Sequence, residues 1–447
     1  MSDRRGSLLQ ASLLRLVRRG AWGHAGRLLE KSHPADIAQV LDRLTDADRR
    51  SVFDLIRSNE IRADVLALLE FAPRADLLAG LEPAVAGELV KRMSPDDAAE
   101  LLRQLPREVA DEILGCLGEF AEEVEVLLGH PADSAGAIMS PEYFALPETM
   151  SVKEAIERLQ RRGDHEASFY VYVVDDRSYL VGVLSLRQLI VQPPDKHLRD
   201  FMVAEPIRVT TETDQEEVAQ IVARYDLLAV PVVDSSNQLV GVVTVDDVID
   251  VIHDEATEDI LKLAGTTVEE IHSPGMMRGA WIRFPWLAAS FVGGFAGIYL
   301  LDRFEGVLSQ TLQIAFFLPI VLAMGGNVGS QCSMVVVRGI ATGHFELRSV
   351  GRIASHEVGT TILLALTFGV GLAGFATLLG YGPPTFPAVV GFAIFASMVM
   401  AATLGTLLPL LLSRAGADPA VASGPFVTTS IDVAGILSFC TIASLLL

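Results

Sequence analysis

The feature that most constrains this chain is a series of long, uncharged apolar stretches in its C-terminal part. Phe284 to Leu301 carries no charged residue, and neither does Val358 to Ser413. A helix of about 20 apolar residues crosses the hydrocarbon core of a bilayer, which is roughly 30 Å thick. A soluble helical bundle does not account for so many segments of this kind. The sequence therefore predicts a multidomain membrane protein.

Charges and turn-forming residues divide residues 278–447 into five predicted transmembrane helices. Tyr381-Gly382-Pro383-Pro384 separates two of them, because neighbouring glycine and proline residues interrupt a helix. The predicted spans are about 280–301, 306–340, 354–380, 386–413 and 419–447.

The arginines predict the orientation, since Lys and Arg accumulate in cytoplasmic loops. They lie before the first span, between the second and third, and between the fourth and fifth: Arg278, Arg283, Arg338, Arg348, Arg352 and Arg414. The opposite loops contain only Arg303, beside acidic residues. We expect a multi-pass protein of the cytoplasmic (inner) membrane, with cytoplasmic N-terminal domains and an external C-terminus.

Asp432 is the only charged side chain in the last span, Pro419 to Leu447. A carboxylate at the centre of a span costs about 2.5–3.5 kcal/mol on insertion scales, and such residues usually mark ion pathways. Its neighbours are small or carry hydroxyls, which lets helices approach closely and offers oxygen atoms to a cation. We predict that Asp432 lines a cation pathway. The alternative is a carboxylate held by structural hydrogen bonds.

The second span has features of a pore-lining segment. Pro319 frees a backbone carbonyl, and Gly325-Gly326 lets the helix unwind or lets another helix approach closely. Carbonyls with one carboxylate are hard oxygen ligands that suit Mg²⁺ or Ca²⁺. Because one Asp is a weak site, we expect twofold symmetry to place two copies of it around a largely hydrated ion. The predicted pore residues are Asp432, Thr428, Gly435, Gly325 and Asn327.

The part of the chain before these spans is strongly acidic. The sequence has 35 basic and 56 acidic residues, a formal net charge of −21, and all of the acidic excess precedes Ser273. This balance disfavours nucleic acid and anionic lipid as partners of the soluble part and favours divalent cations. The three cysteines, Cys116, Cys332 and Cys440, lack the spacing of metal ligands.

Residues 1–130 have the pattern of short amphipathic helices. Prolines recur at expected helix starts, as in Glu82-Pro83 and Ser94-Pro95, and Leu or Ile follows at three- and four-residue spacing. Stacked helical hairpins of this kind form a solenoid. We predict an α-helical solenoid domain with a scaffolding role. Its Arg-rich start, Met1 to Gly20, is interpreted as a first helix rather than a presequence.

Residues 135–254 repeat one α/β pattern, in copies at about 135–200 and 201–254. Each copy has the order strand, turn, strand, helix. The expected strands are Phe169–Val174 and Leu180–Ser185 in the first copy, and Ala229–Asp234 and Leu239–Thr244 in the second, and the expected helices begin at Leu186 and Val245. The leading dipeptides Ile138-Met139 and Phe201-Met202 repeat as well.

This duplication resembles a tandem pair of CBS domains, a Bateman module. In that family the module is a regulatory sensor, often of adenine nucleotides. The resemblance implies ATP as a candidate ligand, and it makes Asp246 or Asp247, which follow the last strand, the candidate to hold the ribose; we select Asp246.

Residues 247–277 are predicted to form an acidic connecting helix and linker. Four carboxylates at three- or four-residue spacing share one helical face: Asp247, Asp250, Asp254 and Glu258. Like charges at this spacing destabilise a helix by roughly 0.2–0.5 kcal/mol per pair. No Lys or Arg occurs in the run before Lys262. We interpret it as a divalent-cation sensor; the alternative is an ordinary solvated face.

With these parts in this order, the chain resembles the MgtE family of magnesium channels over essentially its whole length. The residues that carry the resemblance are Pro319…Gly325-Gly326-Asn327…Gln331…Arg338 and Asp418-Pro419…Gly424-Pro425-Phe426…Asp432…Gly435. The resemblance implies a homodimer with the pore between its subunits and a selectivity site at Asp432. It also implies that cytoplasmic Mg²⁺ closes the pore by bridging the connecting helix to the CBS and N-terminal domains.

The resemblance further implies which carboxylates bind the regulatory Mg²⁺. They are Asp96, Glu100, Asp214, Glu216, Asp226, Asp247, Asp250, Glu255, Glu258, Asp259 and Asp418. At Glu100 the family pattern has an Asp, so this chain departs from it there.

We therefore expect a Mg²⁺-selective channel for magnesium uptake, with Mg²⁺ as substrate and regulator, the lipid bilayer as its setting and no nucleic-acid partner. The alternative is a secondary transporter that couples a divalent cation to H⁺ or Na⁺, which broken helices also fit. An anion channel is disfavoured because the charge within the spans is negative. An enzyme is disfavoured because the spans contain no catalytic triad, His pair or metal-ligand cluster.

Overall fold

The structure is a computed structural model that describes residues 11–17, 19–162, 169–268, 270, 275–342, 350–416, 418–420 and 424–447. The chain forms two compact units, Met1–Ile252 and His253–Leu447, and the boundary falls within one helix, α15. The expected helix of Met1 to Gly20 lies partly outside the described residues, although residues 11–17 are helical. Arg348 also lies outside them.

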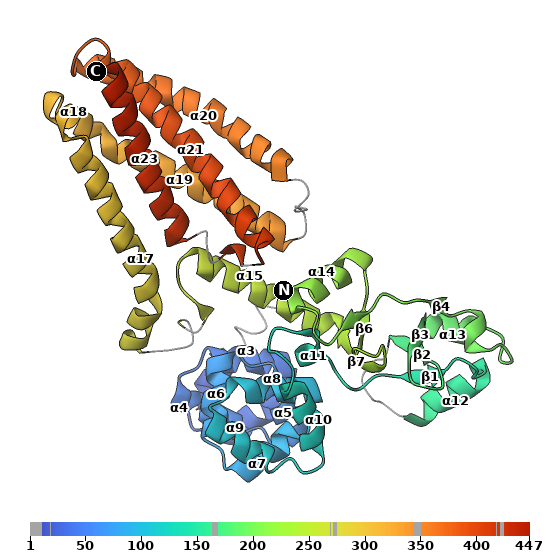
Figure 1. Ribbon diagram of the computed structural model, residues 1–447. Coiled ribbons are helices and arrows are strands. Elements are labelled where there is room, and N and C mark those ends of the chain that lie inside the picture. Colours follow the sequence, from blue (N-terminus) through green and yellow to red (C-terminus); the bar gives the residue numbers. More distant parts are fainter. Residues whose placement is uncertain are drawn as a thin grey trace. The chain divides into compact units, whose positions relative to one another are not determined.

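The first unit begins with a stack of short helices (Figure 1, blue to teal). They are α2 (Trp22–Leu29), α3 (Pro34–Asp42), α4 (Asp46–Phe53), α5 (Asn59–Ala67), α6 (Phe71–Ala79), α7 (Pro83–Val90), α8 (Pro95–Gln104), α9 (Arg107–Leu114), α10 (Phe120–Leu128) and α11 (Ala135–Ile138). Many pack against the helix two places along the chain: α3 on α5, α5 on α7, α7 on α9 and α8 on α10. This stacking is the arrangement of a helical solenoid.

Local sequence explains where these helices begin. Pro83 and Pro95 each occupy the first turn, and the Ser94 hydroxyl accepts a hydrogen bond from Asp97 N–H at 3.4 Å. A proline there loses nothing, because the first N–H groups of a helix have no partner within it. At α9 the proline lies one position earlier, since Pro106 is the N-cap of this helix rather than its first residue.

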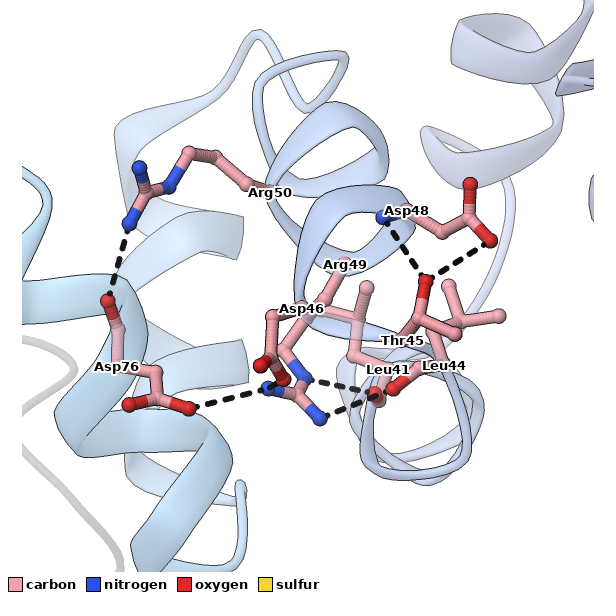
Figure 2. Close-up of polar contacts among 8 residues, drawn as sticks. All are labelled: Leu41, Leu44, Thr45, Asp46, Asp48, Arg49, Arg50 and Asp76. Atoms are coloured by element: carbon pink, nitrogen blue, oxygen red, sulfur yellow. Dashed lines mark hydrogen bonds and ion pairs between the residues drawn. The ribbon is translucent and has the colours of Figure 1, made fainter.

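A buried arginine joins three of these helices (Figure 2). The Arg49 guanidinium donates from Nε to Leu41 O and from Nη2 to Leu44 O, each at 3.0 Å. Its Nη1 lies 2.9 Å from Asp46 Oδ1 and 3.7 Å from Asp76 Oδ2. Arg49 thus adds side-chain hydrogen bonds to carbonyls at and just after the end of α3 and ties α3 and α4 to α6.

The duplicated α/β pattern forms two small sheets. The first repeat contains β1 (Ala145–Pro147), α12 (Val152–Arg162), β2 (Tyr170–Val174), β3 (Leu180–Ser185), α13 (Leu186–Val191), a 3₁₀ turn (Leu198–Asp200) and β4 (Val203–Ala204). The second contains β5 (Val209–Thr210), α14 (Gln215–Tyr225), β6 (Ala229–Val233), β7 (Leu239–Thr244) and the start of α15 (Val245–Leu263). In both sheets the first pair of strands is parallel and the next antiparallel.

The repeated dipeptides explain how the two repeats join. Met139, near the start of the first copy (135–200), packs on Gly241 in β7, where an added Cβ would lie 2.7 Å from the Met139 Sδ. Met202, near the start of the second copy (201–254), packs in the same way on Gly182 in β3. The leading methionine of each copy therefore packs on a strand of the other copy, and the two glycines make room for it.

The second unit contains the long helices (Figure 1, yellow to red). They are α17 (Met276–Arg303), the short α18 (Glu305–Gln310), α19 (Ile314–Ala341), α20 (Val350–Leu379), α21 (Phe386–Arg414) and α23 (Pro425–Leu446). By length and composition, α17, α19, α20, α21 and α23 could each cross a membrane, which agrees with the five predicted spans. The second begins at Ile314 rather than near residue 306, because α18 and a turn precede it.

The glycine pair in α19 does not unwind the helix. Residues 314–341 form one continuous helix with Pro319 inside it. Gly325 instead lies against α21, where a Cβ would be 2.8 Å from Ser397 Oγ. Of the two interpretations of Gly325-Gly326, the structure supports close helix approach.

Candidate cation pathway and acidic clusters

Asp432 lies about two turns into α23. Gly424 and Pro425 begin the helix, and the Thr428 hydroxyl, one turn before Asp432, donates to Gly424 O at 3.3 Å. Asp432 is half-buried, and no other described residue forms a hydrogen bond or ion pair with it. A carboxylate in an apolar unit, with no partner among the residues that the structure describes, fits a cation held directly or through water.

Two of the predicted pore glycines, Gly325 and Gly435, lie against the same side chain, Ser397 of α21. A Cβ on Gly435 would lie 3.2 Å from Ser397 Oγ and 3.0 Å from Leu322 Cδ2. The same Ser397 hydroxyl limits the space at Gly325. Gly325 and Gly435 therefore let α19, α21 and α23 pack closely around Ser397. Asn327 is exposed on α19, and no contact within the described residues joins it to Asp432.

A second group of carboxylates gathers where α8 and α15 begin. Asp96 and Asp97 lie in the first turn of α8, and Asp246 and Asp247 in the first turn of α15. The Thr244 hydroxyl donates to Asp247 Oδ2 at 2.5 Å. Burial raises the pKa of Asp247 to about 8, nearby Asp96 adds to the shift, and the hydrogen bond from Thr244 opposes it.

Asp97 belongs to the same group, although the sequence analysis did not select it. Burial raises the pKa of its carboxyl, the Ser94 hydrogen bond opposes the shift, and Glu100 and Asp246 add to it. Burial is the larger cause of both shifts, and repulsion from the neighbouring carboxylates adds to it. These donor oxygens suit a hard divalent cation, which would relieve that repulsion.

Glu100 has a protein partner. The buried Arg74 places Nη2 3.0 Å from Glu100 Oε1 and also donates to Gln104 Oε1, while Gln104 Nε2 donates to Glu100 at 2.9 Å. Arg74 is 26 residues distant in sequence, so only the fold brings the pair together. A metal ion at Glu100 would share this carboxylate with a guanidinium.

The predicted sensor residues of α14 lie at its two ends. Asp214 caps the start, where its Oδ1 accepts from Glu216 N–H at 2.8 Å. Asp226 ends the helix in a left-handed conformation, with φ 51°. The 11 residues of α14 place these ends about 16 Å apart, so Asp226 cannot share one ion with Asp214 in the same chain.

In the second unit, Lys262 links two of the predicted sensor carboxylates. Its Nζ lies 2.5 Å from Glu258 Oε1 and 2.7 Å from Asp418 Oδ2. Burial raises the pKa of the adjacent Asp259 and Asp418 adds to the shift, while Lys262 and Arg338 oppose it. Lys262 follows Glu258 by four residues, so the sequence alone allows this ion pair to be predicted. The contact between Lys262 and Asp418 joins distant parts of the chain, and no sequence pattern predicts it.

The remaining predicted residues lie on α15. Asp250 is exposed and Glu255 half-buried on this helix, and Asp246 is exposed directly after β7. Across the described ranges, no group of three His, Cys, Asp or Glu side chains lies close enough to hold a metal ion.

Three family models match the chain. Residues 318–442 match a divalent cation transporter, residues 32–133 match the MgtE intracellular N domain, and residues 135–192 and 198–254 match the CBS domain.

Relatives named magnesium transporter MgtE match most of the chain. The protein of Thermus thermophilus is 41% identical over 328 residues, 73% of this chain and 72% of its own length. The protein of Enterococcus faecalis is 38% identical over 73% of this chain and 72% of its own. That of Bacillus subtilis is 35% identical over 72% of each.

Two solved structures resemble the part outside the long apolar helices. The soluble part of a magnesium transporter has a TM-score of 0.50 and 35% identity, covering 56% of this chain and 99% of its own. The cytosolic domain of the Mg²⁺ channel MgtE in complex with ATP has a TM-score of 0.51 and 38% identity, covering 54% of this chain and 99% of its own.

Proposed function

The chain belongs to the MgtE family of divalent cation transporters, and we propose that it is a Mg²⁺-selective channel that takes up magnesium across the cytoplasmic membrane. The observation that carries this proposal is Asp432. It is a half-buried carboxylate in an apolar helix, and no described residue pairs with it. The family is one of transporters rather than enzymes.

The proposed pore lies between two copies of the chain. One Asp per subunit is a weak ligand for a divalent ion, and a twofold axis doubles the negative charge at that point. Mg²⁺ loses its water reluctantly, so Asp432 binds it largely through coordinated water. Thr428, Asn327 and the carbonyls near Gly325 and Gly435 complete the proposed polar lining.

Regulation is proposed to follow from charge. At high cytoplasmic Mg²⁺, ions bind the acidic residues of the N-terminal domain, the CBS repeats and the connecting helix, and the pore closes. At low Mg²⁺ these carboxylates repel one another and the pore opens. Asp96 and Asp247 support this proposal, since their carboxyl groups act on one another and burial, with the charge of Asp96, raises the pKa of Asp247. Mg²⁺ drives the change through its higher affinity for the closed state.

We also propose that ATP binds the CBS repeats of this chain, with Asp246 holding the ribose. The ATP-bound relative of similar fold supports this assignment, and so does the exposure of Asp246 directly after β7. The cytoplasmic location of these repeats and the external C-terminus follow from the arginine distribution.

The pore assignment is tested by Asp432→Asn in purified full-length protein reconstituted in liposomes. We expect Mg²⁺ influx to fall at least about tenfold, because the variant lacks the charge that attracts the hydrated ion. Asp302→Asn, at the end of α17, is the matched control and should retain wild-type flux. Unchanged flux in Asp432→Asn would refute the proposed pore.

The rival function is a carrier that couples Mg²⁺ to H⁺ or Na⁺. Unitary Mg²⁺ currents across a planar bilayer with no H⁺ or Na⁺ gradient are expected of a channel. Flux that stops when that gradient is removed would favour the coupled carrier.

A further inference from the structure

Lys262 occupies the position between two carboxylates that a regulatory cation would bridge. Its ammonium lies 2.5 Å from Glu258 Oε1 and 2.7 Å from Asp418 Oδ2. Asp418 uses its second oxygen as well, since Oδ1 accepts a hydrogen bond from Ala420 N–H at 2.8 Å. Both oxygens of Asp418 are thus engaged by the chain itself.

The backbone of Lys262 lies against the start of the proposed pore helix, α23. Gly424, the N-cap of α23, lies against the end of α15, and a Cβ added there would be 3.3 Å from Lys262 O and 3.5 Å from Leu263 O. α23 carries Asp432 about two turns later. A change in the ion pair between Lys262 and Asp418 therefore takes place close to the first turn of α23.

The charges around Lys262 define a competition. Glu258, Asp259 and Asp418 are acidic, while Lys262 and Arg338 are the cations that act on them. A divalent ion can coordinate Glu258 and Asp418 together only after the ammonium has left, because two cations cannot occupy the same gap between these oxygens. An ammonium is a single charge on a flexible chain, so displacing it costs less than breaking a bidentate arginine pair.

We propose that Lys262 is a positioning residue that holds Glu258 and Asp418 when no divalent cation is bound and competes with the regulatory ion for them. Lys262 thereby sets the cytoplasmic Mg²⁺ concentration at which the pore closes. This inference rests on the proposed function, because it concerns the regulation of that channel.

The proposal predicts the sign of a mutational effect. Lys262→Met keeps the length and apolar stem of the side chain but frees both carboxylates. Partly exposed ion pairs are weak, so we expect the Mg²⁺ concentration for half-maximal inhibition to fall roughly three- to tenfold. A lysine that only clamped α15 in the closed position would have the opposite effect, and its loss would raise that concentration.

The experiment measures Mg²⁺ inhibition of flux in liposomes containing the full-length protein. Lys262→Arg keeps the charge and binds carboxylates at least as firmly, so its midpoint should equal or exceed that of wild type and not fall. Lys91→Met, which breaks the comparable pair with Glu88 at 3.2 Å in α7, should leave the midpoint unchanged. Calorimetric titration of the same purified variants with Mg²⁺ provides a readout independent of transport and should show tighter binding in Lys262→Met.

A double variant tests the route through Asp418. If Lys262 acts on that carboxylate, Asp418→Asn should remove most of the effect of Lys262→Met on the midpoint. A midpoint and a binding affinity that stay at wild-type values in Lys262→Met would overturn the proposal, as would a higher midpoint. Failure of wild-type protein to conduct Mg²⁺, or to close as Mg²⁺ rises, would instead count against the proposed function.

Discussion

At the scale of single residues, burial rather than sequence decides how carboxyl groups behave. Asp42, at the end of α3, is half-buried, and its Oδ1 accepts a hydrogen bond from Glu70 N–H at 3.2 Å. Burial raises its pKa to about 6, the Glu70 hydrogen bond and Arg49 oppose the shift, and the charge of Glu70 adds to it. The folded state therefore holds this proton more tightly than the unfolded chain does.

The linkage between protonation and folding predicts the effect of Asp42→Asn. Because the folded pKa is above the unfolded value, the contribution of Asp42 to stability is complete below about pH 4 and is lost as pH rises through about 6. The amide mimics the neutral carboxyl and still accepts from Glu70 N–H. We expect the melting temperature of the variant to exceed that of wild type at pH 8 and to match it near pH 4. Asp111→Asn, on the exposed face of α9, is the control and should show no such pH-dependent gain.

At the scale of elements, glycines determine how closely the long helices approach. A Cβ added at Gly405 in α21 would collide with the backbone carbonyl of Gly329 in α19, and one at Gly329 would meet Ile431 of α23. Backbone atoms cannot move aside as a flexible side chain can. The close packing of α19, α21 and α23 thus depends on glycines, as it does at other helix interfaces in membranes.

This crossing predicts that Gly405→Ala is costly although it adds one methyl group. Overpacking against backbone costs about 1–3 kcal/mol, so we expect the melting temperature of the detergent-solubilised protein to fall by several degrees. Gly374→Ala in α20, where nothing lies within 4 Å of the added Cβ, should leave it unchanged. Equal melting temperatures for the two variants would contradict the close α19–α21 contact.

At the scale of the whole molecule, we propose that regulation depends on the sum of many carboxylates rather than on one site. Neutralising Asp247, Asp250 and Glu258 together removes three charges from one face of α15. We expect Mg²⁺ currents of this triple variant to persist at cytoplasmic Mg²⁺ concentrations that close the wild type. Neutralising Glu122, Glu123 and Glu125 of α10 removes the same charge elsewhere and serves as the control. Normal inhibition of the first variant would refute the sensor assignment.

The sequence by itself determined the elements of this protein. The period of apolar residues predicted the N-terminal helices, the repeated strand–turn–strand pattern predicted β2, β3, β6 and β7, and uncharged length predicted the five long helices. Each of these signals is local, because propensity, capping and the hydrophobic period act over one or two turns. Asp432 could also be predicted from a local signal, because it is the charged residue within one apolar segment.

Only the tertiary structure decided which side chains meet. It exchanged Met139 and Met202 between the repeats, paired Glu100 with Arg74, placed Asp97 beside Asp246 and set Lys262 between Glu258 and Asp418. It also kept α19 helical through Gly325-Gly326 and placed Gly325 against Ser397 of α21. Such contacts join residues far apart in the chain, and their energies depend on burial and distance, which no local pattern encodes.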